Sequence, residues 1–321
     1  MTRDGSSPRG APRCPASGVL VVDKPRGPTS HHVVSRVRRA LGTRDIGHAG
    51  TLDPMATGVL LLAVGEATKL VPWLTGEDKT YEAAIALGVE TDTLDADGRE
   101  VRVCPPAEEV RAALRESQGG SPVGVLASAI AAERLRTEQV PPAFSAIRKD
   151  GERAYRSARR GEAPALDARP VSVARIELVA CSHDPPRLEL ALTVGKGYYV
   201  RALARDLAAA LGTAGHLTAL RRTRSGSFAD TEAIALDAPR EELLARLQPL
   251  AQAAARCLPV ATLGPDGERD ARFGRSVRPE DIAGPEGVAA WIGTGGDLVA
   301  VGRIEGGRGR VMRGFALREP E

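Results

Sequence analysis

Aromatic residues are scarce in this chain of 321 residues: Trp, Tyr and Phe together make up 3% of it, and only four residues are tyrosines. A hydrophobic core must therefore rest on Ala, Val and Leu. Cysteine is also rare, and its four copies (Cys14, Cys104, Cys181 and Cys257) lie far apart, with no Cys-x-x-Cys pair and no His at zinc-ligand spacing. The sequence predicts a reduced, cytoplasmic protein without structural zinc.

Long hydrophobic runs are missing as well. No apolar run reaches the roughly 18 residues of a membrane-spanning helix, so we expect no membrane association. Residues 1–17 are rich in Pro, Gly, Ser and Arg and lack the apolar stretch of a secretory signal, which predicts a disordered tail. The remaining composition, 42% hydrophobic and 26% charged, is that of a globular protein.

The net charge is only +3, because 44 Lys and Arg face 41 Asp and Glu. The basic residues nevertheless cluster: residues 24–44, 148–160 and 196–224 each carry six of them and at most two acids. Basic stretches that fold onto one face attract a polyanion such as nucleic acid. Taken alone, each stretch is equally well a solvated helix face.

The spacing of hydrophobic residues predicts an alternation of helices and strands. Ser30 is expected to cap the first helix and Gly42 to end it. Helices mixed with antiparallel strands predict an α+β fold, with a domain boundary near residues 250–262. We expect strands over 18–22, 59–64, 81–87, 171–180, 187–194, 298–301 and 311–317, and helices over 30–41, 66–74, 108–117 and 199–211.

Two charged residues are candidates for chemistry. Asp53 ends the polar, glycine-rich segment 47–54, just before a buried strand, and such loops often carry function. Asp-Pro is also a common turn dipeptide. Arg201 follows the segment Gly-Lys-Gly-Tyr-Tyr-Val, and its guanidinium could pair with a carboxylate and keep it ionised. The alternative is an exposed Arg at a strand-to-helix turn.

Several other kinds of site are unsupported. The histidines show no metal-ligand spacing, so we expect no metal. The acid-rich segment 92–98 lacks the ligand positions of a calcium loop and is interpreted as an acidic hairpin loop. No Gly-x-x-x-x-Gly-Lys-Ser/Thr motif occurs, so nucleotide hydrolysis is not indicated.

Five segments, taken in order, resemble one family. They are GVLVVDKPRGPTSH (18–31), GHAGTLDPMATGVLLLAVGEATKL (47–70), KTYEAAIALGVETDTLDADG (79–98), QVPPAFSAIRKDGERAYRSARRGE (139–162) and GKGYYVRALARDLAAALGTAGHLTALRRTRSGSF (195–228). Together they are similar to the bacterial TruB-type tRNA pseudouridine synthases, which isomerise the uridine at position 55 in the T loop of tRNA. The resemblance implies a pseudouridine synthase fold with a mixed, mostly antiparallel sheet flanked by helices, and a small C-terminal PUA-like β domain.

The resemblance also implies roles for individual residues. Asp53 would be the catalytic aspartate, Tyr81 would stack on the flipped uracil, and Arg201 would form an ion pair with Asp53. The implied substrate-binding residues are Lys24, which with Pro25 supports the active-site loop, His48 near the space vacated by the base, Tyr199 and Leu220 in the pocket, and the phosphate contacts Arg148, Lys149, Arg153, Arg156 and Arg159.

The same resemblance implies a domain organisation and a partner. Residues 18–250 would form the catalytic domain, and the insertion 139–162 within it would close on the T stem-loop of tRNA. Residues 255–321 would form the PUA-like RNA-binding domain. The resemblance implies a cytoplasmic monomer that needs no cofactor and no guide RNA.

Other functions stay open on the sequence. A non-catalytic tRNA-binding protein or folding chaperone could use the same scaffold, although a pure binder would not need a carboxylate facing a polyanion. A guide-RNA-dependent enzyme acting on ribosomal RNA is disfavoured by the short C-terminal region without a Lys-rich tail. An unrelated hydrolase with an Asp nucleophile would release free uracil.

Overall fold

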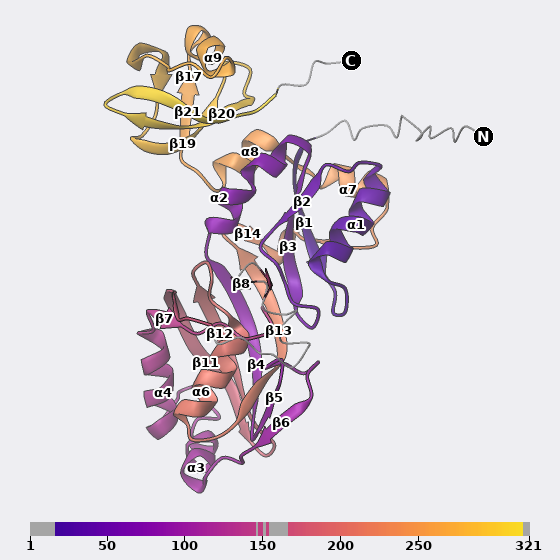
Figure 1. The fold of residues 1–321 in the computed structure, drawn as a ribbon, viewed down its shortest axis with the longest axis vertical. Coiled ribbons are helices and arrows are strands. Elements are labelled where there is room, and N and C mark those ends of the chain that lie inside the picture. Colours follow the sequence, from indigo (N-terminus) through magenta and orange to yellow (C-terminus); the bar gives the residue numbers. More distant parts are fainter. Residues whose placement is uncertain (1–16, 146, 150–151, 154–165, 317–321) are drawn as a thin grey trace, which may run out of the picture. The chain divides into compact units, whose positions relative to one another are not determined.

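The structure is a computed structural model that describes residues 17–145, 147–149, 152–153 and 166–316 (Figure 1). The chain divides into two compact units. Among the described residues, unit 1 contains 17–53, Val59–Thr75 and 226–316, and unit 2 contains Pro54–Gly58 and the described part of Gly76–Ser225.

Unit 1 is built around strand β1, which lies between β3 and β15. β1 runs parallel to β15 and antiparallel to β16, and β2 pairs antiparallel with β3. Apolar side chains from β1, β3 and α8 join one buried core. The elements are β1 (Gly18–Lys24), α1 (Ser30–Leu41), β2 (Ile46–Ala49), β3 (Thr57–Val64), the 3-10 helix η1 (Gly65–Leu70), α2 (Val71–Gly76), β14 (Phe228–Ala229), the 3-10 helix η2 (Asp230–Glu232), β15 (Ile234–Ala235), α7 (Arg240–Ala245), β16 (Gln248–Pro249) and α8 (Leu250–Ala255).

Helix α1 forms where the apolar spacing predicts it, with one correction. Val33, Val34, Val37 and Leu41 make one buried stripe, and Gly42 ends the helix in the left-handed conformation. The prediction that Ser30 caps the helix was wrong by one residue. Thr29 is the N-cap, and its hydroxyl accepts a hydrogen bond from the His32 N–H at 3.2 Å.

The C-terminal part of unit 1 is a separate five-stranded sheet with the order β18-β17-β19-β20-β21. Its core surrounds the fully buried Trp291. Gly302 lies so close to the indole that a Cβ there would come within 2.2 Å of the ring. The elements are β17 (Val260–Leu263), α9 (Pro265–Arg272), the 3-10 helix η3 (Pro279–Asp281), β18 (Ile282–Ala283), β19 (Gly287–Ile292), β20 (Leu298–Glu305) and β21 (Arg308–Gly314). Both strands predicted here form, but β21 ends at Gly314, before Phe315 and Ala316, and Leu317 lies outside the described residues.

Unit 2 is built on the antiparallel strands β11-β12-β4-β13. Helices α3 and α4 pack on β11, and α6 packs on β13 (Figure 1). β4 alternates buried and more exposed residues, as its sequence predicts. The elements are β4 (Lys79–Leu87), β5 (Val89–Thr91), β6 (Glu100–Val103), α3 (Glu108–Glu116), α4 (Gly124–Arg134), β7 (Glu138–Gln139), β8 (Arg148–Lys149), β9 (Glu152–Arg153), β10 (Arg169–Pro170), β11 (Val173–His183), β12 (Pro186–Val194), α6 (Val200–Ala210) and β13 (Gly215–Ser225).

Mixed strand pairing flanked by helices confirms the predicted α+β fold. The strands expected over 171–180 and 187–194 pair antiparallel as β11 and β12, and the acidic hairpin loop predicted over 92–98 joins β5 to β6. In the part of the chain that the structure describes, every helix is too short or too polar to cross a bilayer.

An ion-paired carboxylate stabilises unit 1 after β14. Glu232 accepts hydrogen bonds from both terminal nitrogens of Arg256, each at 2.7 Å, and from the Ala229 N–H at 2.8 Å. The Arg256 guanidinium also stacks 4.0 Å from the centre of the Phe228 ring. Chiefly because of the hydrogen bond with Arg256, the pKa of Glu232 falls to about 2.

This arrangement predicts a loss of stability in acid. A lowered pKa in the folded state means that the carboxylate stabilises the fold above its ordinary pKa of 4.5, and that this contribution disappears as the pH falls towards 2. Solvent screening of this partly exposed pair limits it to about 1 kcal/mol. We expect Glu232→Gln to lower the free energy of unfolding by that amount at pH 7 and progressively less below pH 4.

Denaturant titrations between pH 7 and pH 3 measure this difference. The matched control is Glu242→Gln, which changes an exposed carboxylate on α7. If the difference in unfolding free energy between wild type and Glu232→Gln does not change with pH, the charge of Glu232 contributes nothing to stability.

Candidate active site

The predicted site residues of unit 1 lie on β1, on β2 and in the loop before β3. Lys24 ends β1 with a fully buried side chain, and its ammonium group donates to the Pro25 carbonyl at 3.0 Å. His48 lies on β2, where its ring makes an edge contact with His31 at 5.3 Å between centroids. Asp53 lies in the loop and is partly buried.

The loop around Asp53 is fixed by a residue to which sequence reasoning gave another role. The buried Ser30 hydroxyl accepts a hydrogen bond from the Leu52 N–H at 2.9 Å and donates to the Leu52 carbonyl at 3.1 Å. It therefore holds both main-chain groups of the residue directly before Asp53. The adjacent hydroxyl residues Thr29 and Ser30 could have indicated this role. Only one of the two hydroxyls is needed to cap the helix, so the other is available for a partner distant in sequence.

The chain enters unit 2 immediately after Asp53, at Pro54. Thr57 and Gly58, the first residues of β3, pair in parallel with Arg221 and Arg222 of β13. Gly58 has a positive φ of 96°, and a Cβ there would lie 2.2 Å from the Arg222 carbonyl oxygen. Only glycine allows this close approach, so the segment that follows Asp53 is fixed in register against β13.

Tyr81 and Leu220 occupy the neighbouring strands β4 and β13 and are both largely buried. Tyr81 lies directly across from Arg222 in the antiparallel ladder. Side chains of directly opposed residues lie on the same face of a sheet, so the buried Arg222 lies on the face that carries Tyr81. Sequence reasoning did not single out Arg222, which is one of three arginines in the last five residues of β13.

Lys79 precedes Tyr81 by two positions on β4 and therefore lies on the same face. Burial is the largest cause that lowers the pKa of Lys79, to about 8, and the charges of Arg222 and Lys196 act in the same direction. The carboxylates of Glu77 and Asp78 oppose this shift. Lys79 and Arg222 thus place two basic side chains on the sheet face that carries Tyr81.

Arg201 projects from the first turn of α6 and is 6% exposed. Its two terminal nitrogens donate to the carbonyls of Thr93 and Phe144, both at 3.0 Å, and its Nε lies 3.7 Å from a carboxylate oxygen of Asp95. The alternative of an exposed Arg at a turn is therefore wrong. Asp95 was not predicted as a partner, although it lies in the acid-rich segment 92–98. The predicted pair of Arg201 with Asp53 stays a prediction.

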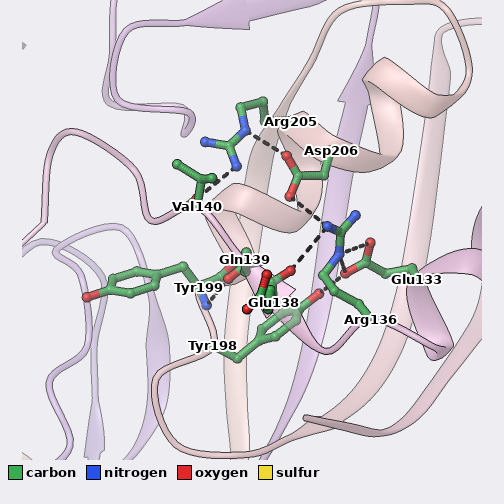
Figure 2. Close-up of polar contacts among 9 residues, drawn as sticks. All are labelled: Glu133, Arg136, Glu138, Gln139, Val140, Tyr198, Tyr199, Arg205 and Asp206. Carbon is green, nitrogen blue, oxygen red and sulfur yellow. Dashed lines mark hydrogen bonds and ion pairs between the residues drawn. The ribbon is translucent and has the colours of Figure 1, made fainter. Parts of the chain in front are cut away.

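Tyr199 is the N-cap residue of α6 and is half-buried. Its main chain, like that of Leu52, is held at both polar groups by one side chain, here the carboxamide of Gln139 (Figure 2). Sequence reasoning assigned no such role to Gln139. Tyr199, Arg201, Tyr81 and Leu220 belong to unit 2, whereas Lys24, His48 and Asp53 belong to unit 1.

The predicted phosphate contacts are only partly described. Arg148 and Lys149 form β8, and Arg153 ends β9, with which β8 pairs. Arg156 and Arg159 lie outside the described residues. Within the described ranges, no group of three or more His, Cys, Asp and Glu side chains is arranged to hold a metal ion.

Comparisons with known proteins give one consistent result. The family model described as TruB family pseudouridylate synthase (N terminal domain) matches residues 38–200, and the tRNA pseudouridylate synthase B C-terminal domain matches residues 201–254. A protein of Arthrobacter sp. (strain FB24) named tRNA pseudouridine synthase B is 43% identical over 94% of this chain and 97% of its own length. A protein of Thermobifida fusca (strain YX) with the same name is 43% identical over 86% of this chain and 91% of its own length.

Solved structures are similar in fold. A structure of an H/ACA RNP bound to a substrate RNA containing 2′-deoxyuridine aligns with a TM-score of 0.66 and 24% identity, over 94% of this chain and 86% of that chain. A crystal structure of the archaeal box H/ACA sRNP Nop10-Cbf5 complex aligns with a TM-score of 0.64 and 24% identity, over 95% and 88%.

Proposed function

The chain belongs to the TruB family of pseudouridylate synthases, and on this premise we propose that it converts the uridine at position 55 in the T loop of tRNA to pseudouridine. The observation that carries the proposal is the near full-length similarity to proteins named tRNA pseudouridine synthase B. The reaction breaks the bond between ribose C1′ and uracil N1 and joins C1′ to C5. C5 loses a proton and N1 gains one, so no electrons are transferred and no water is consumed.

Asp53 is the proposed catalytic residue. The carboxylate must be ionised whether it attacks ribose C1′, adds to uracil C6 or removes a ribose proton, and we favour the last route, through a glycal-type intermediate. A guanidinium beside the carboxylate favours the ionised form, which is the role proposed for Arg201. Ser30 supports the assignment, because its two hydrogen bonds to Leu52 restrict the main chain next to Asp53.

Tyr81 is proposed to stack on the uracil. The target base must leave its stack, which costs a few kcal/mol. Stacking on an aromatic ring returns about 1–3 kcal/mol per base. Tyr199 would line the pocket and Leu220 would form its floor, and both would keep water out. His48 would lie near the space that the base vacates. Lys24 and Pro25 would support the loop.

The proposed partner is the T stem-loop of tRNA, bound by a monomer in the cytoplasm without guide RNA, cofactor or metal. Residues 18–250 would be the catalytic domain, with the insertion 139–162 closing on the RNA, and residues 255–321 would be the PUA-like domain. Support for the RNA contact comes from the basic composition of residues 148–160. Phosphate contacts give affinity, while the shape of the splayed loop gives specificity.

The test is incubation of the purified protein with an unmodified tRNA transcript, without guide RNA or added cofactor, followed by mapping of pseudouridine. We expect one pseudouridine, at position 55. A transcript that is bound but carries no pseudouridine would favour the chaperone alternative over the enzyme, and activity only with a guide RNA would reject autonomous action.

Neutralising the closing segment should weaken RNA binding in a salt-dependent way. Each lost phosphate contact lowers the slope of log affinity against log salt by about 0.7–0.9. We therefore expect the triple variant Arg153→Gln, Arg156→Gln and Arg159→Gln to bind tRNA more weakly, with a slope smaller by about 2 to 3. Filter binding at several salt concentrations measures both quantities.

A matched triple variant removes the same charge elsewhere on unit 2. Arg115, Arg175 and Arg187 are exposed and already paired with Glu108, Glu177 and Glu189, so their change to Gln should leave the slope unaltered. If the first triple variant keeps the wild-type slope, the segment does not contact phosphate.

A further inference from the structure

Gln139 is a buried polar side chain with a specific partner. It lies on β7 and is 2% exposed. Its Oε1 accepts a hydrogen bond from the Tyr199 N–H at 2.8 Å, and its Nε2 donates to the Tyr199 carbonyl at 3.2 Å (Figure 2). A carboxamide carries a donor and an acceptor side by side, so it can bind one residue's main chain at both polar groups, as a neighbouring strand would.

The residue before Tyr199 is anchored independently. The Tyr198 hydroxyl donates to the Glu133 carboxylate at 2.7 Å, and Arg136 donates to the same carboxylate at 2.6–2.7 Å. Burial raises the pKa of Tyr198 far above its usual range, so the phenol stays protonated and remains a donor. In Figure 2 the Tyr198 ring points towards Glu133, whereas the Tyr199 ring points to the opposite side.

Two arginines of α6 form hydrogen bonds with main-chain carbonyls of the residues that follow Gln139. Arg205 donates to the Val140 carbonyl at 2.8 Å, and Arg201 donates to the Phe144 carbonyl at 3.0 Å. Gln139 itself pairs with Arg169 of β10. Three contacts therefore join residues 139–144 to Tyr199 and α6: Gln139 with Tyr199, Val140 with Arg205, and Phe144 with Arg201. Of these three, only the contact between Gln139 and Tyr199 consists of two hydrogen bonds.

We propose that Gln139 is a positioning residue for the isomerisation, acting through the main chain of Tyr199. With Tyr198 anchored on one side and α6 on the other, the two hydrogen bonds of Gln139 set the direction of the Tyr199 side chain and the start of the helix turn that carries Arg201. The inference rests on the proposed function, in which Tyr199 walls the uracil pocket. It adds that Gln139, where the proposed RNA-closing insertion begins, and Tyr199, in the proposed pocket wall, are held rigidly together.

The test compares Gln139→Met, which keeps the length but removes both hydrogen bonds, with Gln139→Glu, whose carboxylate keeps the acceptor but opposes the Tyr199 carbonyl. The matched controls are Gln118→Met and Gln118→Glu at an exposed site. Thermal melting establishes that each variant is folded. We expect both Gln139 variants to lower the single-turnover rate of pseudouridine formation about 10- to 100-fold, with the Kd for tRNA within about threefold of wild type.

A double-mutant comparison separates positioning from general damage. If Gln139 acts through Tyr199, Gln139→Met should cost less than about threefold when Tyr199 is already Ala. An unchanged rate in Gln139→Met, a loss confined to Kd, or an undiminished loss in the Tyr199→Ala background would each overturn the inference. Wild-type protein is assayed in parallel, because absence of pseudouridine there would reject the proposed function itself.

Discussion

Asp53→Asn should abolish pseudouridine formation, lowering turnover by on the order of 10⁴-fold or more, while tRNA affinity stays within about threefold of wild type. Asn has nearly the same shape as Asp, so the Ser30 contacts to Leu52 and the register of Gly58 against Arg222 should persist. What disappears is the negative charge, and a neutral amide can act neither as nucleophile nor as base.

The matched control is Asp45→Asn, which neutralises an exposed carboxylate before β2 in the same unit. Its rate should equal that of wild type. The measurement is single-turnover formation of pseudouridine with enzyme in excess, alongside a Kd for tRNA. Residual turnover within about 100-fold of wild type in Asp53→Asn would remove Asp53 from the catalytic role.

Arg201→Ala should be the second most damaging change, because it affects both stability and rate. Removing the guanidinium leaves the buried Asp95 carboxylate and the Thr93 and Phe144 carbonyls without this donor, which should cost about 3 kcal/mol of unfolding free energy. If Arg201 also keeps Asp53 ionised and aimed, turnover should fall about 100-fold beyond any effect on the folded fraction.

Asp95→Asn distinguishes the two effects. It removes the observed ion-pair partner of Arg201 but leaves the guanidinium in place, so it should lower stability while turnover stays within about tenfold of wild type. Arg201→Lys tests whether the planar guanidinium is needed, because lysine keeps the positive charge but cannot contact Thr93, Phe144 and Asp95 at the same time. Equal losses of rate in Asp95→Asn and Arg201→Ala would assign Arg201 a purely structural role.

Local patterns predicted most of the secondary structure correctly, for a physical reason. The apolar stripe of α1 and the alternation in β4 are properties of a few consecutive residues, and each is decided by which face is buried. The exact cap was missed because Thr29 and Ser30 are both good cap residues. The Ser30 hydroxyl instead forms hydrogen bonds with the main chain of Leu52, 22 positions away, so Thr29 is the residue that caps the helix.

The candidate site was harder to predict, because its supporting contacts join residues far apart in sequence. Gln139 and Tyr199 are 60 positions apart, and Arg201 and Asp95 are brought together only by tertiary packing. The placement of Arg222 opposite Tyr81 depends on the register of β13 against β4, which includes two irregularities. The role of Asp53 was suggested by the resemblance, since the local pattern alone predicts little more than a turn.

The most direct test of the proposed isomerisation follows the hydrogen on C5 of the target uracil. Transcript carrying tritium at C5 of its uridines is incubated with wild-type protein, and released tritium and free uracil are measured together. The isomerisation predicts one tritium released to water per pseudouridine formed, at position 55, with no free uracil and an intact tRNA chain. Release of free uracil, or tRNA that is bound while all its tritium is retained, would contradict it.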